Sequence, residues 1–233
     1  MRGTNEIKLK EYRKKRNFGV SSEPLGESDA SRNVSSSLVY VIQKHRATNL
    51  HYDFRLEWDG TLLSWAVPKG PSLNSSVKRL AMQVEDHPID YATYEGVIAE
   101  GEYGGGTVMV WDNGTWVPEV DDVDGSLRKG ELKFKLLGKK LKGSWILIRT
   151  RGFGSKSGRS WLLIKNHDKY ASTKDITEKA PRSVVSKRLL AEIALDSGGN
   201  VEKATTGDPP RETKVAVRRK RKGTPRRQTR VRS

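Results

Sequence analysis

Short strand-like segments separated by turn signals run through most of this chain, and they limit its fold more than any other feature. Residues 50–58, LHYDFRLEW, alternate polar and apolar side chains, which is the period of a β-strand with one buried face. Asp59-Gly60 follows, and LLSWAV comes next at 62–67, so the two segments predict a β-hairpin. The same reasoning predicts about eight strands in all, at residues 38–43, 50–58, 62–67, 79–85, 107–111, 131–137, 144–149 and 161–165.

Helix-length patterns are missing between these strands. Their absence argues against the alternating strand–helix repeat of a parallel sheet and favours an antiparallel barrel or sandwich. A second hairpin turn is predicted at Asn113-Gly114. One helix is predicted at 183–195, after Pro181 and before Gly198-Gly199. A short basic helix is predicted within residues 1–17, and its apolar anchors are Ile7, Leu9 and Tyr12.

Basic residues are concentrated near the C-terminus. The chain has 44 Lys and Arg against 28 Asp and Glu, a formal net charge of +16. Residues 211–233 contribute eleven of the basic side chains and one glutamate, and so carry +10. A basic segment without aromatic residues cannot bury itself, so we expect a disordered arm that attracts polyanions, most simply nucleic acid. A purely solubilising tail is the alternative.

Several classes of protein are disfavoured by what the sequence lacks. No cysteine is present, so disulfides and thiolate metal sites are excluded, which agrees with a reducing compartment. The sequence has no run of about 18 apolar residues, so it predicts no membrane-spanning helix. The first 18 residues are charged and have no apolar core, so they do not resemble a secretory signal. We expect a cytoplasmic, nucleoid-associated protein with no membrane partner.

The segment QKHRATNLHYDFR, residues 43–55, carries the clearest chemical pattern. Side chains two apart on a strand share a face, so His51, Asp53 and Arg55 should lie side by side. Two imidazoles and one carboxylate are enough to hold a divalent metal with positions open, and His45 at the end of the preceding strand could be the third ligand. Arg55 is a natural bidentate partner for a phosphate. The alternative is a solvated polar face with an incidental histidine.

A second polar group comes from residues 79–91. His87 lies in the turn Glu85-Asp86-His87-Pro88, Tyr91 follows four residues later, and Arg79 precedes His87 by eight. A histidine and a phenol near a bound phosphate could donate a proton or hydrogen bonds to a leaving oxygen. A capped loop histidine is the alternative.

Two other features favour a structural interpretation. The glycine run in GEYGGGTVMV, residues 101–110, could cradle phosphate through backbone N–H groups, but such a run more often forms a bend at a barrel rim. His167 follows a predicted strand in a polar loop and is expected at the surface.

Long motifs of the chain match a known pattern. QKHRATNLHYDFRLEWDGTLLSWAVPKGPS and VEDHPIDYATYEGVIAEGEYGGGTVMVWDNGTW are the most specific, and YRKKRNFGVSSEPLG, GKKLKGSWILIR and SVVSKRLLAEIA support them. With these motifs the chain resembles the 3′-phosphoesterase domain of bacterial DNA ligase D and its stand-alone archaeal and bacterial relatives. The resemblance extends over residues 8–195.

The resemblance implies a fold and an activity. The fold would be mainly β, a small antiparallel β-barrel with a few short peripheral helices. The activity would be that of a manganese-dependent hydrolase in DNA repair by non-homologous end joining, with other divalent transition metals left open. A phosphodiesterase step would remove a 3′-terminal ribonucleoside, and a phosphomonoesterase step would remove the remaining 3′-phosphate to leave a 3′-OH. Substrates would be DNA or RNA/DNA primer-template 3′ ends, with a ligase, a polymerase and Ku-type proteins acting in trans.

Composition and the resemblance together divide the chain. Residues 1–37 would be a basic segment and loop that contribute to the site, residues 38–198 the β-barrel phosphoesterase domain, and residues 199–233 a disordered basic tail.

Carried over residue by residue, the resemblance assigns roles. The metal ligands would be His45, His51 and Asp53. The catalytic residues would be Arg55, His87 and Tyr91. Residues that bind phosphate or substrate would be Arg16, Arg55, Ser64, Lys69, Arg79 and His87, with Glu23, Gln43 and Glu85 in support. One departure is Asn17 in KRNF, where the family commonly has an acidic residue, so the role of that carboxylate is open here.

Two other functions fit parts of the sequence. A non-catalytic nucleic-acid-binding module would use the tail and arginines for phosphate and the histidines for structure. A nuclease or deaminase-like metalloenzyme would act at internal positions.

Overall fold

The computed structural model describes residues 6–26, 37–150, 158–210 and 212. Its strands are β1 Leu38–Arg46, β2 Leu50–Trp58, β3 Thr61–Val67, β4 Lys78–Gln83, β5 Gly96–Ile98, β6 Gly106–Pro118, β7 Glu131–Gly138, β8 Lys142–Arg149 and β9 Ser160–Lys165. Its helices are α2 Lys10–Lys14, the 3₁₀ helix η1 Ile89–Thr93, α3 Val123–Lys129, α4 Ile176–Lys179, α5 Leu190–Asp196 and α6 Val201–Thr205.

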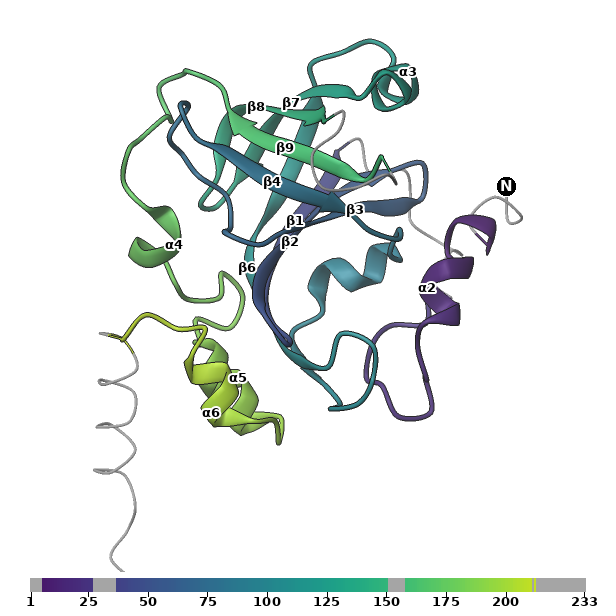
Figure 1. Cartoon of the computed structure of the whole chain (residues 1–233), viewed down its shortest axis with the longest axis vertical. Coiled ribbons are helices and arrows are strands. Elements are labelled where there is room, and N and C mark those ends of the chain that lie inside the picture. The colour runs from purple at the N-terminus through teal and green to yellow at the C-terminus, as the bar shows by residue number, and fades with distance from the viewer. Residues whose placement is uncertain (1–5, 27–36, 151–157, 211, 213–233) are drawn as a thin grey trace, which may run out of the picture.

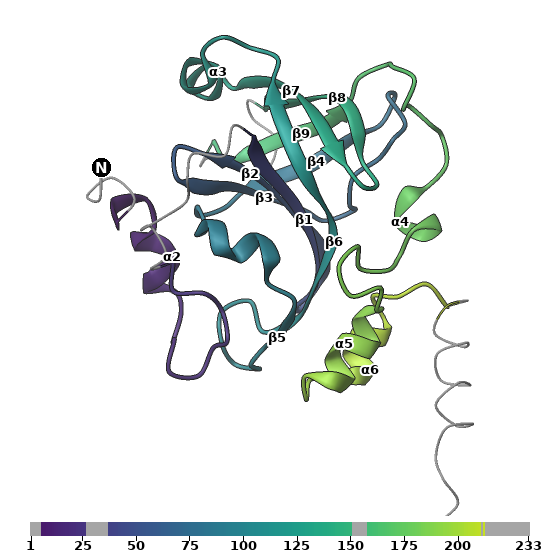
Figure 2. The same cartoon turned by 180° about the vertical axis from the view of Figure 1, so that it is seen from behind.

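Eight of the strands form a closed antiparallel barrel (Figures 1 and 2). The order is β1-β2-β3-β4-β9-β8-β7-β6, and β6 pairs again with β1 to close it, while β5 extends the edge of β6. All of these pairings are antiparallel, which confirms the mainly β, barrel fold class. Strands of this kind need only short connections, which is why turn signals recur so often in the sequence.

The barrel interior is the main core. Alternate residues of β1 and β2, such as Ile42 and Phe54, point inward. They pack with five tryptophans that are almost fully buried, Trp65, Trp111, Trp116, Trp145 and Trp161. The interpretation of most tryptophans as core residues is therefore confirmed.

A second apolar cluster lies on the outer face of the barrel and attaches two peripheral elements to it. Val41, Leu62 and Val110 come from the barrel strands, and Tyr12 and Tyr91 pack against them from the N-terminal segment and from η1. This cluster holds both elements against the outer face of β1, β3 and β6. The polar side chains of the candidate site lie on that same face.

Asn113-Gly114 does not form the predicted hairpin turn, because β6 continues through it to Pro118. The glycine allows a close approach to the neighbouring strand: a Cβ atom at Gly114 would lie 2.3 Å from the carbonyl oxygen of Leu137. Here the missing side chain serves strand packing and not chain reversal.

The predicted helix at 183–195 is shorter than expected, since α5 begins only at Leu190. The Ser183 hydroxyl accepts hydrogen bonds from the amides of Val185 and Ser186, and Lys187 has a left-handed φ of 61°. The amide of Val184 also donates to the carbonyl of Val110 on the barrel. A side-chain turn and a tertiary hydrogen bond thus displace the first half of the helix.

The two termini differ in part from expectation. In the N-terminal segment Leu9 and Tyr12 are buried anchors as predicted, but Ile7 is 76% exposed and is not one. At the other end, α6 lies inside the segment 199–233, so the prediction of disorder from residue 199 is wrong for these first residues. Residues 213–233, which carry most of the basic tail, lie outside the described part of the chain. No helix among the described residues has the length and apolarity needed to span a bilayer.

Candidate functional site

Strands β1, β2 and β3 present a row of polar side chains on the outer face of the barrel. In the β1–β2 register, His45 lies opposite His51 and Gln43 lies opposite Asp53. In the β2–β3 register, Arg55 lies opposite Ser64. The two-residue period of each strand thus places an imidazole pair, a carboxylate and a guanidinium next to one another, as the sequence pattern predicts.

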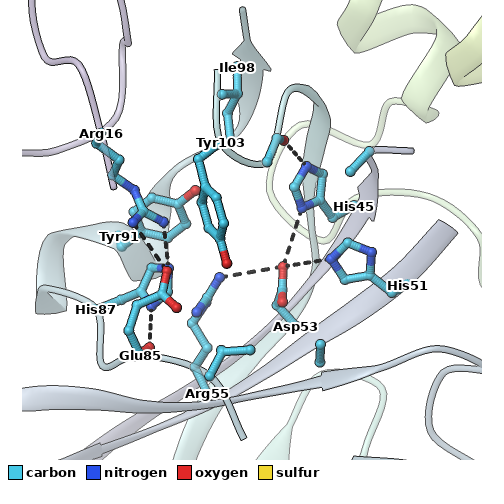
Figure 3. A pocket seen from close by; sticks show the side chains of 14 residues that line it. Arg16, His45, His51, Asp53, Arg55, Glu85, His87, Tyr91, Ile98 and Tyr103 are labelled. Carbon is cyan, nitrogen blue, oxygen red and sulfur yellow. Dashed lines mark hydrogen bonds and ion pairs between the residues drawn. The ribbon is translucent and has the colours of Figure 1, made fainter. Parts of the chain in front are cut away.

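His45, His51 and Asp53 converge closely enough to share one ion. Each offers a ligand atom, and these atoms all lie within 4.8 Å of one another. Oδ2 of Asp53 lies 3.5 Å from Nδ1 of His45 and 3.6 Å from Nε2 of His51 (Figure 3). Two imidazole nitrogens and a carboxylate oxygen suit a divalent transition metal and leave further coordination positions open.

The hydrogen bonds behind the two imidazoles support this arrangement. Nε2 of His45 lies 2.8 Å from the carbonyl oxygen of Gly104, and Nδ1 of His51 lies 3.1 Å from that of Asn49. A carbonyl can only accept, so these outer nitrogens carry the hydrogen. In the neutral rings the inner nitrogens, Nδ1 of His45 and Nε2 of His51, then keep their lone pairs toward Asp53. Backbone carbonyls orient metal-binding histidines in this way in many metal sites.

The charges around Asp53 keep it ionised. Burial alone would raise its pKa, but Arg55 and His51 outweigh burial and hold the pKa of Asp53 well below its usual value. Burial also works against the charged form of His51, yet Asp53 raises the pKa of that histidine. Asp53 is therefore a carboxylate at neutral pH, which is the form that binds a cation.

Arg55 is held through all three of its guanidinium nitrogens. Nε donates to Oε1 of Gln43 at 2.9 Å, Nη1 donates to Oγ of Ser64 at 2.8 Å, and Nη2 lies 3.4 Å from Oδ2 of Asp53. Gln43 is itself fixed, because its amide donates to the carbonyls of Tyr91 and Tyr94 at 2.9 Å each. These contacts fix the orientation of the buried Arg55 guanidinium beside the candidate metal ligands.

His87 is a neutral hydrogen-bond acceptor in this structure. Nη2 of Arg16 lies 3.0 Å from Nε2 of His87, and an arginine can only donate, so Nε2 carries no hydrogen. Nδ1 lies 2.9 Å from the carbonyl of Glu85 and is the protonated nitrogen. Burial, and then Arg55 and Arg16, lower the pKa of His87 well below its ordinary value. This environment opposes the proton-donor role that the sequence left open for His87.

The lowered pKa of His87 predicts a loss of stability in acid. Above pH ~6.5 the ring is neutral in both the folded and the unfolded chain. As the pH falls below that value, the unfolded chain binds a proton that the folded chain resists, so the free energy of unfolding decreases. Urea unfolding at pH 7 and pH 5 should show a smaller loss for His87→Gln than for the unchanged protein. Equal losses would contradict the neutral assignment.

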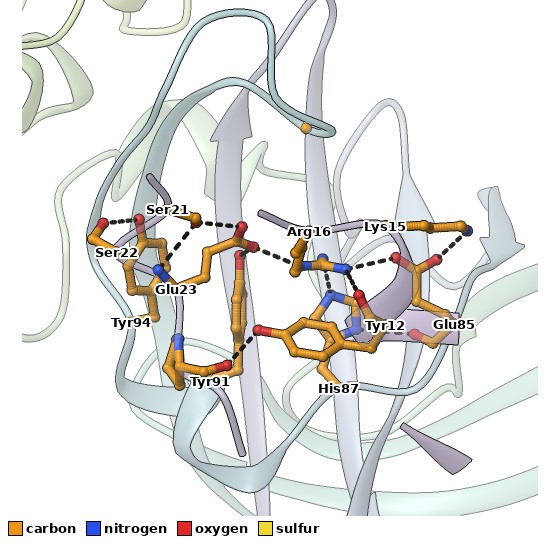
Figure 4. A network of polar contacts seen from close by, with 12 residues as sticks. Tyr12, Lys15, Arg16, Ser21, Ser22, Glu23, Glu85, His87, Tyr91 and Tyr94 are labelled. Carbon is orange, nitrogen blue, oxygen red and sulfur yellow. Dashed lines mark hydrogen bonds and ion pairs between the residues drawn. The ribbon is translucent and has the colours of Figure 1, made fainter. Parts of the chain in front are cut away.

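The N-terminal segment forms the opposite wall of the site through Arg16 (Figure 4). Nε of Arg16 donates to Oε1 of Glu23 at 2.9 Å, and Nη1 donates to Oε1 of Glu85 at 3.3 Å. The Tyr91 hydroxyl donates to the same oxygen of Glu23 at 2.8 Å, and Lys15 pairs with Glu85 at 2.9 Å. Residues far apart in the sequence thus form one buried network behind the cavity.

These walls enclose a cavity of about 220 Å³. It is lined by eight of the predicted site residues: Arg16, His45, His51, Asp53, Arg55, Glu85, His87 and Tyr91. Gln43, Ser64 and Glu23 are buried next to it and bond to its lining residues. The structure thus gathers eleven of the predicted side chains at one place.

Lys69 and Arg79 do not line this cavity. Lys69 is exposed in the turn after β3, and Arg79 lies opposite Leu163 in the β4–β9 pairing. Asn17 is not among the lining residues either, because its side chain accepts a hydrogen bond from the amide of Gly19 at 3.2 Å and so caps a local turn.

Six lining residues were not predicted from the sequence, and two of them, Tyr103 and Gly104, make contacts with other residues of the site. Both lie in the glycine run, which forms the turn leading into β6. Gly104 has a φ of +79°, which favours glycine, and its carbonyl orients His45. An aromatic residue within a glycine run was the available signal for Tyr103.

Comparison with known proteins places the same region in a defined group. Residues 43–149 match the family model described as the DNA ligase D 3′-phosphoesterase domain. The multifunctional non-homologous end joining protein LigD of Pseudomonas aeruginosa is 51% identical over 185 residues, which are 78% of this chain and 22% of that protein. The multifunctional non-homologous end joining DNA repair protein LigD of Mycobacterium tuberculosis is 43% identical over 145 residues, 62% of this chain and 19% of that protein. The chain therefore spans about a fifth of the length of these curated relatives.

Proposed function

Residues 43–149 of this chain belong to the DNA ligase D 3′-phosphoesterase domain family, and from that premise we propose that the protein is a metal-dependent phosphoesterase that prepares 3′ ends for DNA repair. The proposed reactions are removal of a 3′-terminal ribonucleoside by phosphodiester hydrolysis and removal of a 3′-phosphate by phosphomonoester hydrolysis. The first reaction leaves a 3′-phosphate, and the second converts that phosphate end to a 3′-OH. The names of the relatives support a setting in non-homologous end joining.

One observation carries this proposal. The cluster of His45, His51 and Asp53 lies in the same small cavity as the buried guanidinium of Arg55. A cation site beside a fixed guanidinium is complementary to a phosphate, because both offer positive charge to its oxygens. Manganese is the proposed ion, since imidazole ligands suit transition metals better than magnesium. When bound, such an ion polarises a phosphoryl oxygen and lowers the pKa of a coordinated water.

The residues of the chain would act mainly by position and charge. Arg55 would donate its N–H groups to phosphate oxygens and stabilise the charge that grows on them during hydrolysis. Its bonds to Gln43 and Ser64 hold the guanidinium ready before the substrate arrives. Asp53 would fix both the ion and Arg55, which lies 3.4 Å from its Oδ2.

His87 and Tyr91 would act through Arg16. His87 accepts from Nη2 of Arg16, and Tyr91 donates to Glu23, which pairs with Nε of the same guanidinium. Both contacts orient Arg16 at the wall of the cavity, where it would add a second positive charge beside the phosphate. Burial raises the pKa of Tyr91 well above its ordinary value, so its hydroxyl stays protonated and keeps donating.

An end-specific assay tests the proposal. Primers that end in 3′-phosphate, in a 3′-terminal ribonucleotide or in 3′-OH are incubated with the purified protein and Mn²⁺. We expect the first two to be converted to 3′-OH ends and the third to stay intact. A protein that shifts all three primers in a gel and changes none is a binding module only. Cleavage of all three at internal positions indicates a nuclease, and either result contradicts the proposal.

A further inference from the structure

Tyr103 is the aromatic side chain at the cavity that faces solvent. Its side chain is half exposed, at 50%, whereas Tyr12 and Tyr91 nearby are buried at 0% and 2%. Figure 3 shows its ring standing between the Arg16 side and the His45 side, with the hydroxyl end directed into the cavity. The hydroxyl makes no hydrogen bond with the other residues that line the cavity (Figure 3). Neither hydrogen bonding nor full burial therefore explains the position of this ring.

The backbone holds Tyr103 in place from both sides. The amide of Gly105 donates to the carbonyl of Glu102 at 2.9 Å, and the amide of Glu102 donates to the carbonyl of Ala99 at 3.3 Å. Gly104 is tied to His45 through its carbonyl. A half-exposed ring on a loop held in this way is a preorganised surface.

The cavity is too small to hold a whole nucleotide. Its volume is about 220 Å³, below the range of about 300–1,000 Å³ that is usual for pockets enclosing a complete small ligand. A phosphate and an ion fit inside, so the nucleoside attached to that phosphate must lie at the mouth. Tyr103 stands there, and exposed aromatic rings bind nucleobases by stacking, whatever the base.

The basic side chains beside the ring indicate which nucleoside it contacts. The Lys15 ammonium lies 4.9 Å from the centre of the Tyr103 ring, and the Arg16 guanidinium lies 5.9 Å from it. The strand that ends in the phosphate carries further phosphates, whereas a nucleoside beyond the scissile phosphate carries none. Lys15 and Arg16 are both paired with Glu85, so this side of Tyr103 offers N–H donors more than net charge, and such donors match the phosphates of the strand on the 5′ side.

We propose that Tyr103 stacks on the terminal base of the strand that carries the 3′-phosphate, and that it places that phosphate in the cavity. This inference rests on the proposed function, because it takes a 3′ end of nucleic acid as the ligand. The glycine run would then have two roles, the orientation of His45 and the placement of Tyr103.

Binding to two matched single strands tests the stack. Both end in 3′-phosphate, and one lacks the base of its last nucleotide. Fluorescence anisotropy is measured on the full chain in EDTA, so that no hydrolysis occurs. The unchanged protein should bind the strand with the base about 5- to 150-fold more tightly, the range that one base–aromatic stack gives. Tyr103→Leu should lose this preference, and Tyr103→Phe should keep it.

Tyr170→Leu is the matched control. Tyr170 is also partly exposed, at 42%, and Lys169 lies 5.3 Å from its ring centre, but it does not line the cavity. This variant should keep the preference of the unchanged protein. Nonspecific attraction by the basic tail acts equally on both strands and cancels in their ratio.

The inference is wrong if the unchanged protein shows no base preference, or if Tyr103→Leu keeps the full preference. It is also wrong if, in strands that carry one more ribonucleoside beyond the phosphate, affinity depends on the base of that ribonucleoside and not on the base before the phosphate. The proposed function fails differently. If the unchanged protein hydrolyses no 3′ end with Mn²⁺ but shows a Tyr103-dependent base preference in EDTA, the stacking inference is supported and the proposed phosphoesterase activity is contradicted.

Discussion

Replacing Asp53 with Asn should abolish turnover of a 3′-phosphorylated primer, with a loss of at least about 10³-fold, and should weaken Mn²⁺ binding in the same variant. The amide has nearly the shape of the carboxylate but no charge. The variant therefore lacks the anionic oxygen that Oδ2 of Asp53 places between the two imidazoles. Isothermal titration with Mn²⁺ and a phosphate-release assay measure the two effects.

Asp59→Asn is the control for this change. Asp59 lies in the turn of the same β2–β3 hairpin and pairs with Lys8 at the surface. Its positive φ of 44° suits asparagine as well as aspartate. This variant should keep both metal binding and turnover. If Asp53→Asn kept them too, the assignment of the three metal ligands would be lost.

Replacing Arg55 with Lys should separate phosphate recognition from metal binding. The charge remains, so Asp53 stays ionised and the Mn²⁺ affinity should change by only a few-fold. A lysine cannot reproduce the planar fork that reaches Gln43, Ser64 and Asp53 at once. We expect the turnover number to fall by about 10²- to 10³-fold, which is the usual loss when one preorganised donor to a developing anion is removed.

Arg149→Lys is the matched control, because this arginine also lies on a barrel strand, β8, but outside the cavity. Its guanidinium donates to the carbonyls of Leu127 and Arg128. Turnover at the unchanged rate is expected for this variant. An Arg55→Lys protein as active as the unchanged one would show that the guanidinium geometry plays no part in the reaction.

The sequence predicted the strands well, but it predicted poorly those turns and helix ends whose conformation depends on tertiary contacts. Alternation at 50–58 correctly predicted the strand β2, but its outer face is covered as well, so residues 52–56 are buried on both faces. The turn predicted at Asn113-Gly114 was wrong because the close approach of a neighbouring strand decided the conformation there. The helix predicted at 183–195 is present only from Leu190, because a side-chain turn replaces its first half. Strand β5 has three residues, too few for any period to show.

The candidate site divides in the same way. His51, Asp53 and Arg55 share a face through local strand geometry, so their proximity followed from spacing alone. The contact between Arg16 and His87 joins residues 71 positions apart, and only the fold or a family resemblance can predict it. Tyr103 was missed because its role depends on the path of a glycine loop, for which a single sequence has no periodic signal.

The three candidate ligands come from nine consecutive residues, His45 to Asp53, that turn back on themselves between β1 and β2. A link that closes so short a loop removes little freedom from the unfolded chain, and the barrel is already closed by the pairing of β6 with β1. An ion held there would link only the adjoining ends of β1 and β2 and would contribute little to the stability of the whole barrel. The proposed ion could therefore be lost or exchanged without loss of the fold, so that ligand chemistry and not folding would decide which ion binds.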